Sequence, residues 1–268
     1  PSTFAQNAKI VQIDIDRSEI NKNVQTDHHI VGDCKRVLEL LLERVQPMNH
    51  DEWMQYVFSF KTETEYDEAT DHLTPQQVLS SIARICPQDT IVSTDVGQHQ
   101  MWAIQHFHFD YPGQLLTSGG FGTMGFGLGA AIGAQVSHPD KCVLHVTGDG
   151  GFRMNCNELA TESYYKLPII NVVFNNGTLG MVRQWQTLIY NKRFASTTLD
   201  RAPDFVKLAE AYGLTGKRVT TVEELEIALH EALACGHGYV IDCVIDMDEK
   251  VRPMVGGGSH ITDFMLNS

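Results

Sequence analysis

One stretch in the middle of the chain constrains the fold more than any other, because it has the pattern of a complete βαβ unit. An apolar run at 143–146 predicts a strand, which the glycine-rich turn 148–151 ends. The segment 155–165 can be helical, and a second apolar run at 168–174 predicts another strand that stops on two asparagines. Parallel strands joined by a helix end at the same edge of a sheet, so the polar residues after both strands are expected to lie together.

The polar residues at that edge are Asp149, after the first strand, and Asn176, after the second. Carboxylate and amide oxygens suit Mg²⁺, which keeps further positions for water and substrate phosphates. Gly150 and Gly151 allow close approach of the backbone, and the helix N-terminus after them offers free N–H groups to an anion. A Gly-Asp-Gly tripeptide by itself is more typical of an ordinary turn. The asparagines at the far end of the unit favour a magnesium–diphosphate site instead.

The segment from Gly148-Asp149-Gly150 to Asn175-Asn176 resembles the thiamine-diphosphate signature, which runs from Gly-Asp-Gly to Asn-Asn. Other segments are similar, in the same order, to the catalytic (large) subunit of acetolactate synthase, also called acetohydroxyacid synthase. These segments are GQHQMW at 97–102, TSGGFGTMG at 117–125, NELAT at 157–161, LGMVRQW at 179–185 and VRPMV at 251–255. The resemblance covers nearly the whole chain. It implies an α/β fold, a parallel sheet with helices on both faces, preceded by a remnant of a second α/β domain.

The resemblance assigns the metal and the diphosphate to residues of these motifs. The implied metal ligands are Asp149, Asn176 and the backbone carbonyl of Thr178. The implied diphosphate contacts are Gln98, His99, Gly150 and Gly151. A histidine after a strand is more often a capping or core residue, and the match to the family is what favours His99 over His106 and His108.

The resemblance also assigns Gly122 and Met124 to the aminopyrimidine ring of the cofactor. Gly122 would bond the ring nitrogens through its backbone, and Met124 would sit under the bend between the two rings. Met181 is a further implied cofactor contact, while Val182 and Trp185 are implied to line the substrate channel. These three residues share one helical face, so plain core packing is the alternative for them, as it is for Met124.

A run of glycines precedes these residues. Gly120-x-Gly122-x-x-Gly125 formally matches the dinucleotide fingerprint, but no clear strand leads straight into it and no convincing acidic partner follows. Gly125, Gly129 and Gly133 repeat every four residues, which predicts a smooth helix face against which a neighbouring element packs closely.

The beginning of the chain, 1–46, is expected to be the C-terminal part of a central, nucleotide-type domain. The expected elements there are strands at 9–15 and 30–31 and a helix with an apolar stripe at 37–45. The resemblance implies that this domain holds the adenosine portion of FAD in the intact enzyme, with Asp14 and Asp33 as contacts. Solvated turn carboxylates are the alternative for both, and the residues alone favour that alternative.

An acidic linker at 47–72 is expected next, with one docked helix and then the diphosphate-binding domain at 73–268. The linker helix presents Trp53, Tyr56, Val57 and Phe60 on one face and is followed by Thr62-Glu63-Thr64-Glu65. The elements expected in the domain are a helix capped by Thr74, a strand at 90–94, a helix at 202–212, a short strand ending at Val219, a helix at 223–234 and a strand at 239–244. The tail from Val251 is glycine-rich and predicted to be mobile, and its Gly256-Gly257-Gly258 departs from the proline-containing version usual in the family.

Composition limits the partners. The net charge of −13 disfavours nucleic acid and anionic membranes, so an anionic cofactor must be held by local dipoles and a metal. The six cysteines form no C-x-x-C and are expected to be reduced residues of an intracellular protein. No signal peptide and no membrane-spanning run is recognised. The chain begins abruptly at Pro1 and is expected to be the C-terminal part of something longer.

The function implied by the resemblance is the diphosphate-binding part of acetolactate synthase, in the cytoplasm or, in a eukaryote, an organelle. In that family the cofactor ylid attacks pyruvate, carbon dioxide leaves, and the enamine adds to a second 2-keto acid in branched-chain amino-acid synthesis. Another thiamine-diphosphate 2-keto acid decarboxylase or carboligase and a non-catalytic cofactor-binding module are the alternatives.

The implied partners include a pyrimidine-binding domain, from the same or another chain, that supplies a general-base glutamate. Glu158 lies in the diphosphate domain's own helix and is not that glutamate. This chain alone is therefore expected to be inactive. A homo-oligomer and a regulatory subunit are also implied.

Overall fold

A computed structural model of the chain describes residues 4–59, 71–201, 203–260 and 262–265. The chain forms two compact units, one mainly of Pro1–Asp67 and the other mainly of Glu68–Gly256. None of the described helices combines the length and the apolar character that a membrane-spanning helix needs.

The first unit contains a small parallel sheet and two helices. Strands β1 (Val11–Asp14) and β2 (His28–Val31) pair in parallel, and helices α1 (Cys34–Leu42) and α2 (Asp51–Phe58) follow. A short 3-10 helix, Arg17–Glu19, lies between the strands. The two strands and both helices predicted from the sequence are confirmed, whereas Phe60 and the segment 62–65 fall outside the described residues.

The two aspartates considered for FAD make local bonds in this unit. Asp33 is the N-cap of α1 and accepts a hydrogen bond from the backbone N–H of Arg36 at 2.9 Å. The carboxylate of Asp14 accepts from the N–H of Asp16, also at 2.9 Å. Such bonds are typical of turn and cap carboxylates, the alternative that the residues alone favour.

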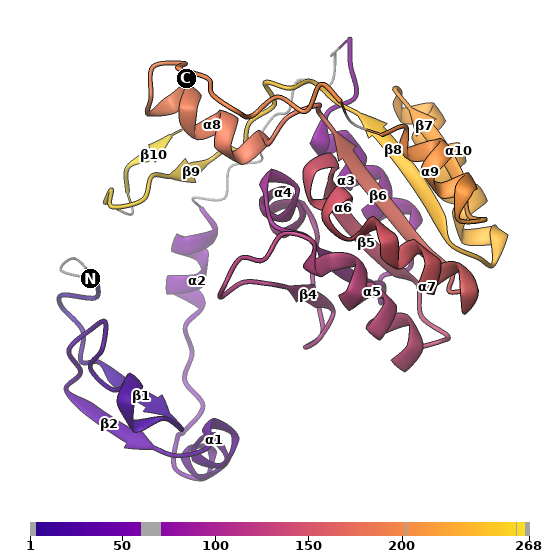
Figure 1. Ribbon diagram of the computed structural model, residues 1–268. Helices are drawn as coiled ribbons and strands as arrows, with labels where there is room; N and C mark the ends of the chain where they lie inside the picture. Colours follow the sequence, from indigo (N-terminus) through magenta and orange to yellow (C-terminus); the bar gives the residue numbers. More distant parts are fainter. Residues whose placement is uncertain (1–3, 60–70, 202, 261, 266–268) are drawn as a thin grey trace. The chain divides into compact units, whose positions relative to one another are not determined.

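The second unit is built on a six-stranded sheet (Figure 1). Its strands are β3 (Ile91–Thr94), β4 (Leu115–Thr117), β5 (Val143–Gly148), β6 (Ile169–Asn175), β7 (Thr215–Val219) and β8 (Tyr239–Val244). The order across the sheet is β4-β3-β5-β6-β8-β7, and every neighbouring pair is parallel. The predicted α/β class with a parallel sheet is confirmed.

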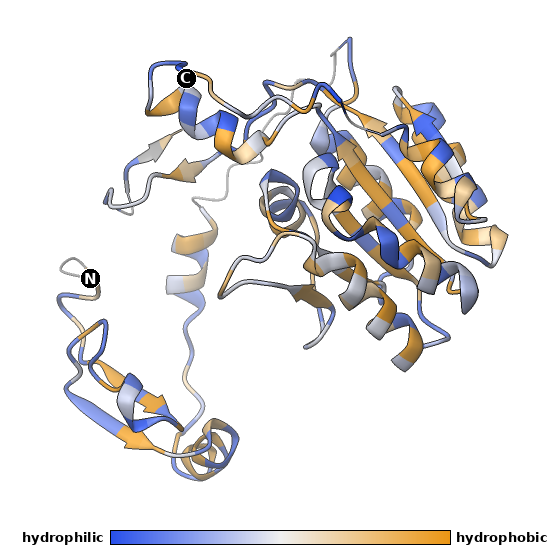
Figure 2. Ribbon diagram, viewed as in Figure 1, coloured by the Kyte–Doolittle hydropathy of each residue, from blue (hydrophilic) through white to orange (hydrophobic). Residues whose placement is uncertain are grey.

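Helices cover both faces of this sheet, as a parallel sheet requires. They are α3 (Pro75–Ile85), α4 (Gln98–His106), α5 (Phe126–Ser137), α6 (Asp149–Asn155), α7 (Leu159–Tyr164), α9 (Phe205–Ala211) and α10 (Val222–Cys235). Helix α8 (Gly180–Leu188) contacts the tail instead, through Gln184 and Met254. Strand β6 shows why both faces are needed: Val172 packs with residues of α3, α4 and α10, while Val173 packs with residues of α5, α6 and α9. β6 and β8 are accordingly hydrophobic along most of their length (Figure 2).

Helix α3 starts as its sequence predicts. Thr74 accepts a hydrogen bond from the N–H of Gln77 at 3.2 Å, and the Gln77 side chain accepts one from the N–H of Thr74 at 3.0 Å, with Pro75 in the first turn. This capping box confirms the predicted helix start.

The helix predicted at 155–165 forms as a 3-10 turn at Cys156–Glu158 followed by α7 (Leu159–Tyr164). The glycine turn predicted at 148–151 is wrong, because helix α6 begins at Asp149. The glycines 150 and 151 thus belong to the first helical turn, where the N-terminal carboxylate stabilises the helix. A strand does precede the glycine run that starts at Gly120, although none was recognised in the sequence. This strand, β4, has only three residues and is too short to show an alternating apolar pattern.

Two packing predictions also fail. Gly129 and Gly133 are exposed, and among the described residues no atom outside the adjoining helix backbone comes within 4 Å of a Cβ built there. The close approach is made by Gly127, whose added Cβ would lie 2.8 Å from the Asp95 nitrogen.

In the tail, Val251 and Met254 are buried. Strands β9 (Met254–Val255) and β10 (Phe264–Met265) pair antiparallel, so this part of the tail is packed.

The other predictions for this unit hold to within a few residues. The strands β3, β7 and β8 and helices α9 and α10 all form where expected. Ala202, the first residue of the predicted 202–212 helix, lies outside the described residues, and α9 starts at Phe205 after the N-cap Asp204.

Candidate functional site

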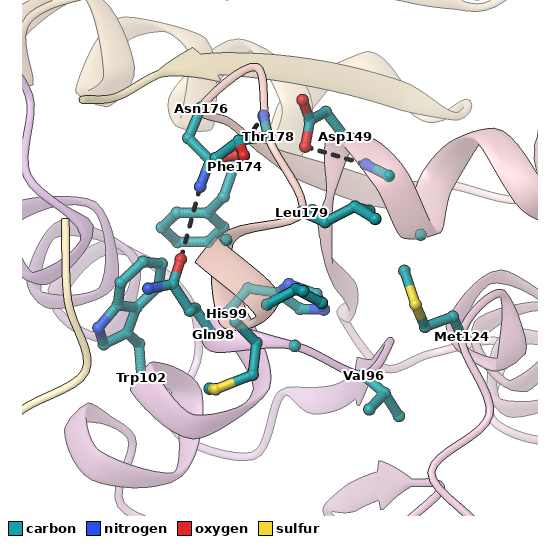
Figure 3. A pocket seen from close by; sticks show the side chains of 17 residues that line it. Val96, Gln98, His99, Trp102, Met124, Asp149, Phe174, Asn176, Thr178 and Leu179 are labelled. Atoms are coloured by element: carbon teal, nitrogen blue, oxygen red, sulfur yellow. Dashed lines mark hydrogen bonds between the residues drawn. The ribbon is translucent and has the colours of Figure 1, made fainter. Parts of the chain in front are cut away.

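The carboxyl ends of β3, β5 and β6 meet at one edge of the sheet and open onto a pocket. Register alignment places Thr94 beside Val146, and Gly148 beside Phe174, so the loops that follow the three strands converge there. The pocket, together with the open solvent at its mouth, has a volume of about 490 Å³. Figure 3 shows Asp149, Asn176 and Thr178 around it, as the βαβ pattern predicts.

Most of the residues singled out in the sequence line this pocket. They are Gln98, His99, Met124, Asp149, Gly150, Gly151, Asn176, Thr178, Met181 and Val182. Gly122 and Trp185 are not among the lining residues. Seven residues to which the sequence analysis gives no individual role also line it, namely Val96, Gly97, Trp102, Gly148, Phe174, Leu179 and Gly180. Gly97, Trp102, Gly148, Leu179 and Gly180 lie inside the motifs quoted above, whereas Val96 and Phe174 carry no sequence signal beyond their place at or after the end of a strand.

Asp149 has an unused oxygen in the pocket. Its side chain is 1% exposed; Oδ1 accepts a hydrogen bond from the N–H of Gly150 at 2.9 Å, and Oδ2 is buried without a partner. Burial raises the pKa of Asp149 to about 6, because a carboxylate loses hydration there. A buried carboxylate oxygen with no donor is a place where a cation is stabilising.

The turn after β6 is held in a fixed conformation. Asn176 Oδ1 accepts a hydrogen bond from the N–H of Thr178 at 3.1 Å, and the Thr178 hydroxyl donates to the carbonyl of Thr197 at 2.9 Å. Any side chain at Gly180 would overlap the Gln98 amide, so glycine is required there. The described residues contain no cluster of three His, Cys, Asp or Glu that could hold a metal. A cation at Asp149 therefore has to complete its shell with neutral oxygens, water or a bound anion.

The Gln98 side chain is engaged elsewhere. Its Nε2 donates to Gln184 Oε1 and to the carbonyl of Glu249, both at 2.8 Å, and its Oε1 accepts from Asn176 Nδ2 at 3.5 Å (Figure 3). Both amide hydrogens are thus used. A diphosphate contact by Gln98 would come from its backbone N–H at the start of α4.

His99 lies against glycines. A Cβ at Gly97 would come within 2.9 Å of its ring, and one at Gly148 within 3.0 Å. Its Nε2 is buried without a partner, and burial lowers the pKa of His99 to about 4, so the ring is neutral at pH 7. Together with Asp149 Oδ2, this gives the pocket two unpaired polar atoms.

Asp95 hydrogen-bonds two elements that border the pocket, although the sequence patterns assign it no role. Oδ1 accepts from the N–H of Gly127 at 2.6 Å, and Oδ2 accepts from the Thr147 hydroxyl at 2.8 Å. A Cβ on Gly151 would lie 2.6 Å from Oδ2. Asp95 thereby links the N-terminus of α5 to β5 and packs against the start of α6. The sequence signal that could have identified Asp95 is its position as an acidic residue directly after a buried strand.

The apolar side of the pocket is formed by Met124 and Leu179. A Cβ on Gly150 would lie 2.8 Å from the Leu179 side chain and 3.8 Å from that of Met124, so only glycine leaves this space open. Met124 points into the pocket in Figure 3. Gly122 has a left-handed φ of 71° and is exposed beyond the pocket.

We expect the two tryptophans near the site to differ in structural importance. Trp102 is 4% exposed with its ring centroid 5.9 Å from that of Phe174, whereas Trp185 is only half-buried. Trp102→Ala should cost about 3–5 kcal/mol of stability. Trp185→Ala should cost well under half of that stability, because the Trp185 side chain is only half-buried. Thermal unfolding of both variants measures the difference, and equal losses would show that Trp185 is a core residue.

Comparison with known proteins agrees with this geometry. Residues 95–243 match the family described as "Thiamine pyrophosphate enzyme, C-terminal TPP binding domain". Residues 1–41 match "Thiamine pyrophosphate enzyme, central domain". The chain belongs to the thiamine pyrophosphate enzymes.

Within that class the chain is similar to acetolactate synthase large subunits, which confirms the predicted resemblance. It is 40% identical over 284 residues to the probable acetolactate synthase large subunit of Methanococcus aeolicus, covering 98% of this chain and 47% of the relative. It is 41% identical over 276 residues to the acetolactate synthase isozyme 3 large subunit of Escherichia coli K12, covering 98% and 48%. The chain thus spans about half the length of the curated relatives it matches.

A solved structure shares the fold. The thiamine diphosphate-dependent 4-hydroxybenzoylformate decarboxylase of Rhodococcus jostii RHA1 superposes with a TM-score of 0.77 at 25% identity, covering 91% of this chain and 45% of that one.

Proposed function

We propose that the pocket binds thiamine diphosphate through Mg²⁺ and that the intact protein is an acetolactate synthase. The observation that carries the proposal is the unpaired buried oxygen of Asp149 beside Asn176 and Thr178. A divalent cation would neutralise that carboxylate and leave positions for diphosphate oxygens. The glycines of the pocket leave the space that such a group needs.

Each residue has a part in this proposal. Asp149 Oδ2, Asn176 Oδ1 and the Thr178 carbonyl would hold the metal. His99 and the backbone N–H groups of Gln98 and of α6, including Gly150 and Gly151, would face the diphosphate. Met124, Met181 and the backbone of Gly122 would contact the rings, and Val182 and Trp185 would border the path of the substrate. When bound, thiamine diphosphate supplies the carbon nucleophile and electron sink of the reaction.

The domain division belongs to the same proposal. Residues 1–46 would be the C-terminal part of a central domain, 47–72 a linker, and 73–268 the diphosphate-binding domain. The matches at 1–41 and 95–243 support this division. In the intact enzyme FAD would occupy the central domain. A pyrimidine-binding domain, further copies of the chain and a regulatory subunit would be its partners.

The reaction proposed is the condensation of pyruvate with pyruvate or 2-ketobutyrate, with loss of carbon dioxide. Its support is the identity of about 40% with acetolactate synthase large subunits over 98% of the chain. The test incubates pyruvate with cofactor, Mg²⁺ and the chain, alone and with a polypeptide that carries the pyrimidine-binding domain. Acetolactate as the product supports the proposal. Acetaldehyde would indicate a decarboxylase instead, and cofactor binding without either product would indicate a binding module.

A further inference from the structure

Three carboxamide side chains form a row of hydrogen bonds that leads from the tail to the turn after β6. The row consists of Gln184 on α8, Gln98 on α4 and Asn176, which follows β6. Gln184 and Gln98 are only 2% and 4% exposed. Buried amides that are fully hydrogen-bonded keep one orientation, so the direction in which each amide of this row points can be followed from bond to bond.

The backbone of Val251 sets the orientation of Gln184. The N–H of Val251 donates to Gln184 Oε1 at 2.9 Å, and Gln184 Nε2 donates to the carbonyl of Val251 at 3.2 Å. A backbone N–H can only donate and a backbone carbonyl can only accept. The oxygen and the nitrogen of the Gln184 amide therefore cannot exchange places.

Gln184 and the tail together set the orientation of Gln98. Gln98 Nε2 donates to Gln184 Oε1 and to the carbonyl of Glu249, both at 2.8 Å. Both partners are acceptors, so the nitrogen of Gln98 has to face them and its oxygen has to face the other way. That oxygen accepts a hydrogen bond from Asn176 Nδ2 at 3.5 Å (Figure 3).

Asn176 ends the row with its nitrogen toward Gln98 and its oxygen toward the backbone of its own turn. Asn176 Oδ1 accepts from the N–H of Thr178 at 3.1 Å. Gly180 leaves room for the two amides to meet, because a Cβ there would overlap Gln98 Oε1 and lie 2.7 Å from Asn176 Nδ2. The direction of the Asn176 amide is thus determined from both of its ends.

We propose that Gln184 is a positioning residue for the metal site, because through Gln98 it keeps the oxygen of Asn176 turned away from the tail. A reversed Asn176 amide would present N–H groups where a magnesium ligand has to be an oxygen. Gln184 is not among the residues that line the pocket, so it acts only through Gln98. The part that concerns Mg²⁺ rests on the proposed function, whereas the orientation of Asn176 does not.

The tail has other attachments that a change at Gln184 leaves in place. Trp102 Nε1 donates to the carbonyl of Lys250 at 3.4 Å, and Arg183 donates to both carboxylate oxygens of Asp248, at 2.9 and 3.1 Å. A variant at Gln184 therefore tests the orientation of the row more than the docking of the tail.

The orientation is tested without any ligand, by amide hydrogen exchange of the full chain followed by NMR. Gln184→Met keeps a side chain of similar length and removes its hydrogen bonds. Exchange at the Thr178 N–H should become at least about fivefold faster, because its acceptor Asn176 Oδ1 is released. The Leu199 N–H, which donates to the carbonyl of Gly177 in the same turn at 2.8 Å, should keep its rate.

Gln105 offers the matched control, because it also bonds the tail from α4 but takes no part in the row. Its Nε2 donates to the carbonyl of Pro253 at 3.3 Å. Gln105→Met should leave the exchange rate at Thr178 unchanged. Gln184→Glu keeps an oxygen that accepts from Gln98 and should restore most of the slow exchange.

Titration of thiamine diphosphate in the presence of Mg²⁺ tests the effect on the metal site. Gln184→Met should bind at least about fivefold more weakly than the parent chain, and Gln105→Met should bind like the parent. A coupling of this kind is reciprocal, so thiamine diphosphate with Mg²⁺ should slow exchange at the Val251 N–H of the parent by a similar factor.

The outcomes separate this proposal from the proposed function. An unchanged rate at Thr178 in folded Gln184→Met, or equal acceleration at Thr178 and Leu199, would overturn the proposal whether or not the cofactor binds. Accelerated exchange with unchanged cofactor affinity would also overturn it, because Asn176 would then not need the row. A parent chain that binds no thiamine diphosphate with Mg²⁺ would contradict the proposed function, and the exchange rates would still decide whether the row orients Asn176. If Gln184→Met does not fold, Gln98→Met breaks the next bond of the row and should accelerate exchange at Thr178 in the same way.

Discussion

Asp149→Asn should abolish the magnesium dependence of thiamine diphosphate binding and weaken binding by at least about a hundredfold. A unit charge pair 4 Å apart at a partly buried site is worth about 4 kcal/mol, and hydration of the released ion returns part of this energy. The asparagine keeps the size of the side chain and its bond to the Gly150 N–H, so the change removes mainly the charge. Isothermal titration of the cofactor with and without Mg²⁺ measures the effect.

The matched control is Asp140→Asn, which removes the same charge from an exposed carboxylate before β5. It should bind like the parent protein, and both variants should keep the parent's circular dichroism. Affinity in the parent that is the same with metal, without metal and with a chelator would contradict the proposed role of Asp149, even if the cofactor binds.

The position of this site at the carboxyl edge of the sheet could be predicted because two buried strands are recognisable in the sequence. β5 and β6 are buried on both faces, β5 is followed directly by Asp149, and β6 ends on Asn175 before Asn176. The topology of parallel strands then fixes where Asp149 and Asn176 meet. The βαβ pattern needs no tertiary information beyond the direction of the strands. The start of α6 was missed because glycines usually end regular structure, whereas here they are tolerated in a first helical turn that Asp149 begins.

What could not be predicted depends on partners far away in the chain. The Gln98 amide looks free in sequence, yet Gln184 and Glu249 take both of its hydrogens. Asp95 looks like a turn residue, yet it bonds Gly127 and the Thr147 hydroxyl. No local pattern encodes these contacts, because they appear only after the helices have packed on the sheet.

A chain of buried polar side chains runs from Asp95 to Glu162, and we expect it to make the stability of the fold depend strongly on pH. His145 Nε2 lies 4.0 Å from Asp95 Oδ2, and His145 Nδ1 lies 2.9 Å from Asn171 Oδ1. Asn171 Nδ2 donates to both carboxyl oxygens of Glu162, at 3.0 and 3.1 Å. Glu162 is fully buried, and a side chain at Gly238 would overlap its carboxyl group.

Burial raises the pKa of Glu162 to about 8, and the bond from Asn171 offsets only part of the shift. Below the unfolded pKa of about 4.5, both states hold the proton and stability does not depend on this group. Between that value and about 8 the unfolded chain releases a proton that the folded chain keeps. The free energy of unfolding therefore falls as the pH rises through this window, by roughly 1.4 kcal/mol per pH unit.

Three other buried groups, His99, His145 and Asp149, change how the free energy of unfolding varies with pH, but only below about pH 6.5. The pKa values of His99 and His145 are lowered by burial, so these side chains make the fold more stable as the pH rises toward about 6.5. Asp149, with its pKa raised to about 6, acts in the same direction as Glu162 but only up to that pH. The window from about pH 6.5 to 8 thus isolates Glu162 among these four groups.

In that window the parent chain should lose roughly 2 kcal/mol of stability, and Glu162→Gln should remove most of the loss. The glutamine has nearly the same shape, carries no titrating group, and its carbonyl oxygen can still accept from Asn171 Nδ2. Urea unfolding followed by circular dichroism at several pH values gives the slopes, with Glu210→Gln on the exposed face of α9 as the matched control. Equal slopes for the parent and Glu162→Gln would show that Glu162 is ionised in the folded protein, and that burial does not hold its proton in place.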